Sequence, residues 1–322
     1  MTYLYLVIGL ILVIKGADFM VEGASSIARK FRISDFVIGL TVVSFGTSLP
    51  ELIIGLFAGQ KDASDMIIGN VVGSNIANIL LVLGVAAAIN PLPATNRTVW
   101  REIPFTLIAS LIFWVLVNDH VMSGSNDSAL GRNDGLVLLV CFCGFIMYAF
   151  SIIRKQQKLE TEWGGEVVDH KPLRSTVEIM AGMAGLYFGG VLAVEMGAIP
   201  IAKAWGMSQG MIGLTVIAIG TSLPELATSV VASLKKNTDI AVGNVVGSNI
   251  FNIFIVLGVT STVSPIAFDE KFNTDIIIML VATFILFFTM FIGSPKRTIQ
   301  RGEAILFLVM YFAYMGFVVN RG

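Results

Sequence analysis

Two phrases in this sequence each occur twice, at one constant separation. The hexapeptide GTSLPE fills residues 46–51 and returns unchanged at 220–225, while the heptapeptide GNVVGSN fills 69–75 and returns at 243–249. Each second copy lies 174 residues after the first. A shared separation over both phrases predicts a chain built from two repeats of one structural unit.

The composition places these repeats in a membrane. Hydrophobic residues make up 55% of the 322 residues and charged residues only 13%, against about 25% charged in soluble domains. Windows of about 20 apolar residues predict an all-α integral membrane protein with ten transmembrane helices in a lipid bilayer. The ten predicted spans are 3–24, 36–58, 67–89, 102–118, 134–153, 175–198, 210–233, 241–263, 274–293 and 303–319.

The loops predict how the repeats are oriented. The longest loop, 154–174, separates 1–153 from 175–322, and each of these repeats holds five spans. Lys and Arg number 15 on the face that carries this linker and 5 on the opposite face. This excess predicts a cytoplasmic linker and both termini outside the cell. Because five spans reverse the chain direction, the second repeat enters from the opposite side, giving the inverted-topology repeats typical of secondary transporters.

Each hexapeptide carries a glutamate, Glu51 or Glu225, near the middle of a span that holds no Lys or Arg. A lone charged side chain at that depth costs about 2.5–3.5 kcal/mol on insertion scales. The carboxyl group is therefore protonated and hydrogen-bonded between helices, or paired with a cation. The segments 38–52 and 212–226 share 12 of 15 residues, while the rest of the repeats match poorly. This selective identity favours a shared cation chemistry.

A proline precedes each glutamate and predicts exposed backbone oxygens. Pro50 has no N–H to donate to the carbonyl of Gly46, and its ring crowds that turn. Pro224 acts in the same way on Gly220. The alternative is that each proline only kinks its helix. Hydroxyl groups lie beside both prolines, on Thr47, Ser48, Thr221 and Ser222.

The heptapeptide regions add side-chain oxygens at a spacing of four, which places them on one face of a helix. These residues are Asn70, Ser74 and Asn78 in the first repeat and Asn244, Ser248 and Asn252 in the second. Asn78 and Asn252 fall at the centres of their spans, which favours a role in a site. For Asn75 and Asn249 we favour hydrogen bonding between helices.

Glycines at the same spacing predict close helix contacts of the GxxxG kind. They are Gly69 and Gly73 in the first repeat and Gly243 and Gly247 in the second.

The predicted ligands are all oxygen atoms, including two carboxylates. Such a set suits Ca²⁺ or Na⁺, whereas Zn²⁺ or Cu⁺ would require His or Cys. The two histidines, His120 and His170, lie in loops. The sequence contains no phosphate-binding GxxxxGK[ST] phrase and no hydrolase motif. We therefore expect a transporter rather than an enzyme, with no cofactor, no nucleic-acid partner and no obligate protein partner.

The repeated GTSLPE and GNVVGSN phrases resemble the paired alpha-repeats of the cation/calcium exchanger superfamily. The chain is most similar to the small prokaryotic sodium/calcium exchangers, over essentially all ten spans, which implies a place in a prokaryotic cell membrane. The resemblance implies Ca²⁺ binding by the Glu51 and Glu225 carboxylates and the carbonyls of Thr47 and Thr221. It also implies that spans one and six are long, tilted helices that slide across the core.

By the same resemblance, a dozen residues would form the Na⁺ sites, with Ser44 and Ala218 contributing backbone carbonyls. These residues are Ser44, Thr47, Ser48, Glu51, Ser74, Asn78, Ala218, Thr221, Ser222, Glu225, Ser248 and Asn252.

Departures from the family pattern argue against K⁺ and H⁺ as coupling ions and favour Na⁺. Potassium-dependent relatives carry Asp where this chain has Asn252, and cation/proton relatives carry Glu near Gly73. The linker 154–174 is too short for calcium-sensing domains. We therefore predict a secondary Na⁺/Ca²⁺ antiporter that works by alternating access. The alternatives are a Ca²⁺/H⁺ antiporter, a K⁺-dependent Na⁺/Ca²⁺ antiporter and a passive cation channel.

Overall fold

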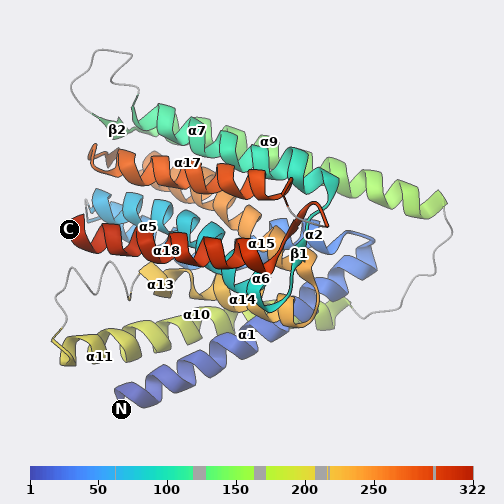
Figure 1. Cartoon of the computed structure of the whole chain (residues 1–322), viewed down its shortest axis with the longest axis horizontal. Coiled ribbons are helices and arrows are strands. Elements are labelled where there is room, and N and C mark those ends of the chain that lie inside the picture. The colour runs from blue at the N-terminus through green and yellow to red at the C-terminus, as the bar shows by residue number, and fades with distance from the viewer. Residues whose placement is uncertain are drawn as a thin grey trace.

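The computed structural model describes residues 1–61, 63–118, 128–162, 172–206, 216, 218–292 and 295–321. These residues form a bundle of helices with four strands of two residues each (Figure 1). In several helices a short π-helical segment, labelled η, interrupts or continues the α-helix.

The first repeat contains α1 (Thr2–Phe31), α2 (Asp35–Ile38), η1 (Gly39–Val43), α3 (Ser44–Thr47), α4 (Leu49–Gly59), α5 (Ser64–Ala77), η2 (Asn78–Val82), α6 (Leu83–Ile89), β1 (Leu92–Pro93), η3 (Thr98–Glu102), α7 (Ile103–Val117), β2 (Ala129–Leu130) and α9 (Arg132–Glu162). The second contains α10 (Pro172–Val191), η4 (Leu192–Ala198), α11 (Ile199–Ala204), α13 (Ala218–Thr221), α14 (Leu223–Leu234), α15 (Thr238–Phe251), η6 (Asn252–Leu257), α16 (Gly258–Val263), β3 (Ile266–Ala267), α17 (Phe272–Thr289), β4 (Thr298–Ile299) and α18 (Arg301–Arg321).

Eight helices in the described part of the chain are long and apolar enough to cross a membrane, and a bent pair raises the number to nine. The all-α membrane fold is therefore confirmed, while the count of ten predicted spans is not reached. The missing span, 210–233, begins on residues outside the described part of the chain, which omits 207–215 and 217. Much of the predicted linker also lies outside it, at 163–171.

Each hexapeptide breaks its helix at the serine. The chain bends by 41° between Asp35–Thr47 and Leu49–Gly59, and Ser48 (φ −90°, ψ 5°) and Ser222 (φ −86°, ψ 6°) share one non-helical conformation. A new helix then starts with proline in its first turn, where the missing N–H has no helical partner to lose. Glu51 and Glu225 lie in these first turns, where the helix dipole favours negative charge.

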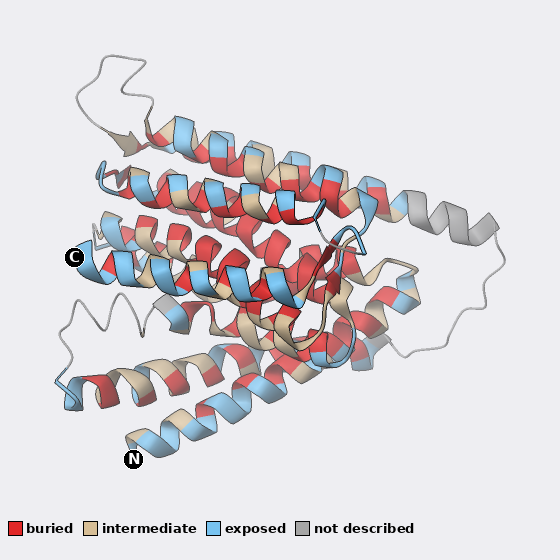
Figure 2. Cartoon of the chain, viewed as in Figure 1, coloured by how far each residue is buried: buried red, intermediate tan, exposed pale blue. Residues whose placement is uncertain are grey.

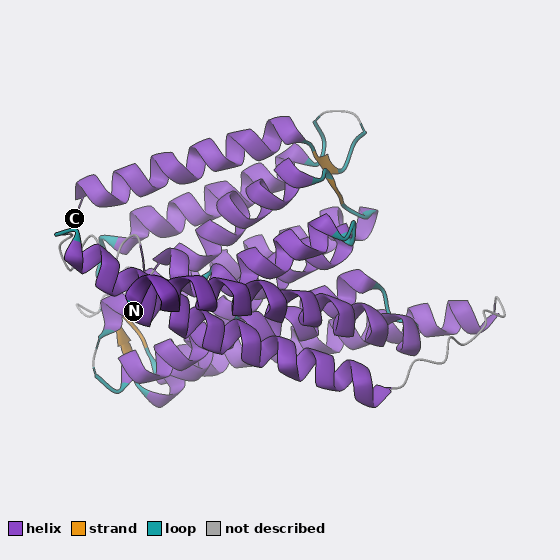
Figure 3. Cartoon of the chain, turned by 90° about the horizontal axis from the view of Figure 1, so that it is seen from below, coloured by secondary structure: helices purple, strands orange, loops and turns teal. Residues whose placement is uncertain are grey.

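The short strands show how the repeats are related. β1 pairs with β4 and β2 pairs with β3, so each two-stranded sheet joins one strand from each repeat. The two sheets lie at opposite ends of the bundle (Figure 3). Both termini lie at the end that carries β2, whereas α9 points toward the other end (Figure 1). This arrangement is that of two interwoven repeats with inverted topology.

The centre of the bundle is formed by the spans that carry the heptapeptides. Within an 18-residue apolar window of each span, buried residues make up 94% for Thr238–Val263 and 72% for Ser64–Ile89, against 22% for α18. The outer helices expose large apolar side chains such as Val140, Met147 and Phe312, and Figure 2 shows exposed positions along the outer helices. Because lipid tails are the matching solvent for such faces, the outer surface of the bundle fits a bilayer.

Two long helices, α1 and α10 with its continuation, lie against each other along one side of this centre. They span 30 residues (Thr2–Phe31) and 32 residues (Leu173–Ala204), and α1 runs obliquely to α17 and α18 (Figure 1). A Cβ atom on Gly16 would lie 2.6 Å from the backbone nitrogen of Leu186. The two backbones are therefore in direct contact, and α1 and α10 pack as one unit.

Candidate cation site

The structure brings the two hexapeptides and the two heptapeptide regions together at the centre of the bundle. Glu51 and Glu225 are both fully buried and interact electrostatically across the repeat boundary. Among the described residues, no group of three or more His, Cys, Asp or Glu side chains could hold a metal ion. A cation here would therefore be held by two carboxylates and neutral oxygen atoms. The predicted side chains of Thr47, Ser48, Ser74, Asn78, Thr221, Ser222, Ser248 and Asn252 are all buried, and those of Ser48 and Ser248 contact Glu225.

The Glu225 carboxylate is held by hydroxyl groups. Ser48 Oγ donates to Glu225 Oε1 across the repeat boundary, at 3.0 Å. Ser248 Oγ donates to the same oxygen at 3.4 Å. The second oxygen, Glu225 Oε2, is buried and has no hydrogen-bond partner among the described residues.

Asn244 supports this half of the site from α15. Its Nδ2 donates to the Glu225 carbonyl (3.4 Å) and to Ser229 Oγ (3.1 Å). Its Oδ1 accepts a hydrogen bond from Thr47 Oγ1 at 3.1 Å. Asn244 therefore connects the first hexapeptide to the helix that carries Glu225. Ser229 was not anticipated from the sequence, because it lies outside the repeated phrases.

The Glu51 carboxylate lacks the hydrogen bonds that the Glu225 carboxylate accepts. Both carboxylate oxygens of Glu51 are buried without a hydrogen-bond partner among the described residues, as are Ser222 Oγ, Ser74 Oγ and Asn70 Nδ2. Buried polar atoms are almost always hydrogen-bonded, and an unpaired buried carboxylate is especially costly. The unpaired oxygens of Glu51, Ser74 and Ser222 could be satisfied by a bound cation, whereas Asn70 Nδ2, an N–H donor, could not.

Two amide oxygens complete the set. Asn78 and Asn252 are the first residues of η2 and η6, so each lies where an α-helix passes into a π-helical segment. π-Helical segments of this kind occur frequently at functional sites. The amide nitrogens of both residues donate hydrogen bonds to other asparagines. Their Oδ1 atoms are buried without a partner among the described residues.

The resemblance implies that the backbone carbonyl of Ser44 is a Na⁺ ligand. Its carbonyl oxygen accepts from Ser48 N at 3.0 Å and from Thr47 Oγ1 at 3.3 Å. The single proton of Thr47 Oγ1 has a shorter contact to Asn244 Oδ1 at 3.1 Å, so the hydrogen bond from Ser48 N is the main one and a lone pair of the Ser44 carbonyl remains. Its counterpart, Ala218, begins α13.

The predicted close contacts at the glycines occur in only one repeat. A Cβ atom on Gly243 would lie 3.0 Å from Leu40 N, and one on Gly247 would lie 2.5 Å from Ser44 Oγ. In contrast, a Cβ atom on Gly73 would meet no atom of the described residues within 4 Å. A cavity of about 410 Å³ borders this face of α5 and is lined by Gly69, Asn70 and Gly73, among others.

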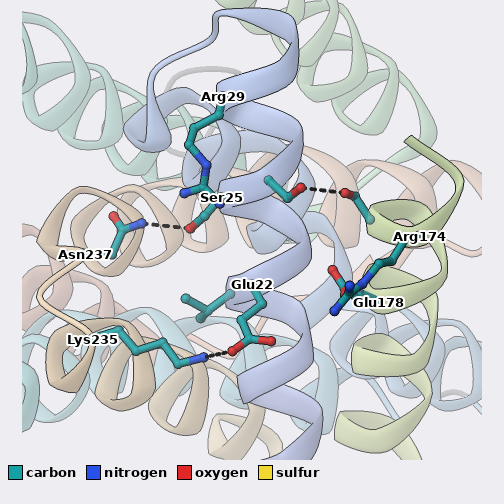
Figure 4. Close-up of a pocket in the computed structure, with 10 residues that line it drawn as sticks. Glu22, Ser25, Arg29, Arg174, Glu178, Lys235 and Asn237 are labelled. Atoms are coloured by element: carbon teal, nitrogen blue, oxygen red, sulfur yellow. Dashed lines mark hydrogen bonds and ion pairs between the residues drawn. The ribbon is translucent and has the colours of Figure 1, made fainter. Parts of the chain in front are cut away.

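A second, polar cavity of about 510 Å³ lies between α1, α10 and the turn from α14 to α15 (Figure 4). Here Lys235 forms ion pairs with Asp18 and with Glu22, the latter at 2.9 Å. These ion pairs connect α1 to the turn between α14 and α15. Partial burial acts to lower the pKa of Lys235, but the two carboxylates outweigh it and hold that pKa above its ordinary value.

Comparison with known proteins agrees with this architecture. The model of the family described as "Sodium/calcium exchanger protein" matches residues 1–151 and 175–320. The chain belongs to this family.

Individual members of the family match along almost the whole chain. The putative antiporter CaxA of Alkalimonas amylolytica is 38% identical over 97% of this chain and 96% of its own length. The sodium/calcium exchanger MaX1 of Methanosarcina acetivorans is 31% identical over 97% of both chains. A solved structure of the sodium-calcium exchanger NCX_Mj superimposes with a TM-score of 0.80 at 33% identity, covering 97% of this chain and 96% of that one.

Proposed function

We propose that this protein is a secondary antiporter that exchanges Na⁺ for Ca²⁺ across the membrane. The observation that carries this proposal is the pair of buried carboxylates, Glu51 and Glu225, with three of their four oxygens unpaired among the described residues. Ionised carboxylates with surrounding neutral oxygens suit Ca²⁺ and Na⁺. Membership in the family and the similarity to named sodium/calcium exchangers support the same ions.

In the proposed site, Ca²⁺ is bound by the carboxylates of Glu51 and Glu225 and the carbonyls of Thr47 and Thr221. The unpaired oxygens of Ser74, Asn78, Ser222 and Asn252 support these side chains as Na⁺ ligands. Ser48 and Ser248, which now bond to Glu225, would exchange that bond for a cation contact. The carbonyls of Ser44 and Ala218 complete the proposed Na⁺ set.

The difference between the two repeats supports alternating access. α2 and η1 pack on Gly243 and Gly247 of α15, and we infer that this packing closes the route to the site from the end of the bundle near β1. The cavity beside Asn70 and Gly73 opens the route from the other end, where both termini lie. By the distribution of Lys and Arg, the closed end is cytoplasmic and the structure faces outward. A reporter fused to the C-terminus should therefore be exposed outside the cell, and protection of that reporter would reverse the assignment.

The transport proposal is tested by flux through purified protein in lipid vesicles. An outward Na⁺ gradient should drive uptake of ⁴⁵Ca²⁺, and replacing internal Na⁺ by K⁺ or by a proton gradient should abolish it. Uptake driven equally by a proton gradient would favour Ca²⁺/H⁺ exchange, and uptake requiring both Na⁺ and K⁺ would favour the potassium-dependent alternative. Ion conductance without counterflow would identify a channel and overturn the proposal.

The same vesicles measure the charge that moves. Two ionised glutamates carry −2, so one Ca²⁺ neutralises them and three Na⁺ leave +1. Three-for-one exchange is therefore electrogenic, and a membrane potential changes its energy by about 2.3 kcal/mol per 100 mV for each net charge. We expect uptake to respond to a potential set with K⁺ and valinomycin. Uptake that ignores the potential would indicate two-for-one exchange instead.

A further inference from the structure

Four asparagines from the two central helices form a closed hydrogen-bond network between the repeats. Asn75 Nδ2 donates to the carbonyl of Asn249 at 3.4 Å, and Asn249 Nδ2 donates to the carbonyl of Asn75 at 3.3 Å. Asn78 Nδ2 donates to Asn249 Oδ1 at 3.0 Å, and Asn252 Nδ2 donates to Asn75 Oδ1 at 3.1 Å. The bonds form reciprocal pairs, as expected for a contact that lies on a two-fold axis.

The network determines which way each amide faces. A backbone carbonyl can only accept, so the Asn249 carbonyl requires the Nδ2 of Asn75 and leaves Asn75 Oδ1 turned away from it. That oxygen is also only an acceptor, so it requires the Nδ2 of Asn252. If the Asn252 amide flipped, two acceptor oxygens would face each other and the amide nitrogen would point toward the cation site.

All four side chains are buried to within 1% of full burial. Asn75 and Asn249 each use both their amide oxygen and their amide nitrogen within the network. Asn78 and Asn252 use only their nitrogen, and their oxygens are the two atoms of this network without a partner among the described residues. The network thus ends in two oriented acceptors, one from each repeat.

We propose that Asn75 and Asn249 are positioning residues of the ion site. Each holds the site asparagine of the opposite repeat with its oxygen toward the cation: Asn75 orients Asn252, and Asn249 orients Asn78. This inference rests on the proposed transport function. Neither positioning residue contacts an ion. Because Na⁺ depends more on neutral oxygen ligands than Ca²⁺ does when two carboxylates are present, the loss of orientation should weaken Na⁺ binding more than Ca²⁺ binding.

The test is a pair of double-mutant cycles read out as the Na⁺ concentration for half-maximal Ca²⁺ exchange. Asn75→Leu should raise that concentration about fivefold to tenfold, the factor for one lost hydrogen bond. If Asn75 acts through Asn252, the double variant Asn75→Leu/Asn252→Ala should be no worse than Asn252→Ala alone. The cross pair Asn75→Leu/Asn78→Ala should instead show the product of the two single effects.

The second cycle is the matched control, because the repeat symmetry reverses the pairing. Asn249→Leu should be coupled to Asn78→Ala and should act independently of Asn252→Ala. Asparagines that only hold the helices together would couple equally to both partners or to neither. Equal coupling in the direct and cross pairs would therefore overturn the proposal.

A second readout separates this proposal from the transport function itself. Ions that bind the folded protein stabilise it by RT ln(1 + [Na⁺]/Kd), so the same cycles can be measured as the Na⁺-induced shift in melting temperature in detergent. If wild-type protein binds Na⁺ but does not exchange it for Ca²⁺, the transport proposal fails while the positioning proposal is still tested. If Na⁺ gives no shift in the wild type, the positioning proposal fails. Should Asn75→Leu not fold, Asn75→Ser replaces it, because a hydroxyl on Cβ is too short to reach the Asn252 amide.

Discussion

Glu225 and Glu51 occupy equivalent positions in the two repeats, yet their surroundings differ. Glu225 accepts hydrogen bonds from Ser48 and Ser248. Asn244 on α15 forms hydrogen bonds through both its amide oxygen and its amide nitrogen. Glu51 has no hydrogen-bond partner among the described residues. The same residue types thus form a closed half and an open half. Part of this difference is one of sequence, because Ser229, which bonds to Asn244, is replaced by Gly55 at the equivalent position. We expect the rest to be a difference of conformation that the opposite state would exchange.

The largest expected effect comes from the carboxylates. Glu51→Gln and Glu225→Gln should each reduce Na⁺-driven ⁴⁵Ca²⁺ uptake by at least about 100-fold, because losing one charged partner of a buried pair costs about 3–5 kcal/mol. Both variants should remain folded, since a neutral amide is less costly to bury than a carboxylate. Glu303→Gln, which keeps an acceptor for the Gln300 N–H, is the matched control. Normal uptake by either site variant would refute the site.

Alanine substitutions of the two hexapeptide serines, Ser48 and Ser222, should differ in their effect on the free energy of unfolding. Ser48→Ala removes a hydrogen bond to a charged group and should lower the free energy of unfolding by about 1.5–3 kcal/mol in ion-free protein. Ser222→Ala removes a hydroxyl without a partner among the described residues and should leave that stability unchanged. Both should weaken the response to Na⁺. Equal melting temperatures for the two variants would show that the asymmetry is absent in solution.

Substitutions at the heptapeptide glycines are expected to affect stability in one repeat and the rate of exchange in the other. Gly247→Ala places a methyl group against Ser44 and Leu40 and should destabilise the protein by about 1–3 kcal/mol, as overpacking does. Gly73→Ala meets no described atom within 4 Å and should leave the melting temperature unchanged. It should nevertheless slow exchange, because the opposite state requires Gly73 to take the crowded position. Full transport activity in folded Gly73→Ala would argue against exchange of the two environments.

The smallest expected effect lies at the ends of the bundle. Lys235 is paired with Asp18 and Glu22 of α1, whereas the positions 174 residues later are the uncharged Leu192 and Met196. The Lys235 ion pairs with α1 therefore have no equivalent between Lys61 and the corresponding residues of η4. Lys235→Gln should change the rate of exchange by a factor of about 2–5, since partly exposed ion pairs contribute about 1 kcal/mol or less. Lys61→Gln, at the equivalent position, should change it less, and high salt should remove the difference between the two variants.

Much of the architecture was predictable from local patterns. The apolar windows anticipated the described spans to within a few residues at most ends, and the Pro50 and Pro224 positions anticipated the breaks at Ser48 and Ser222. These features depend on residues close together in sequence, through hydropathy, proline geometry and helical spacing. The excess of Lys and Arg on one face likewise needed no knowledge of contacts.

The sequence by itself determined that two identical hexapeptides would bring two carboxylates into a membrane, and which oxygen-bearing residues would accompany them. Only the tertiary structure decided which of those oxygens are already bonded. The hydrogen bonds that set this, from Ser48 to Glu225 and among Asn75, Asn78, Asn249 and Asn252, join residues 171 to 177 positions apart. The repeated phrases are the same in both repeats, so the difference comes from residues outside them, such as Ser229 opposite Gly55, and from tertiary packing. α2 and η1 pack against α15, which carries the second heptapeptide, whereas a cavity borders α5, which carries the first.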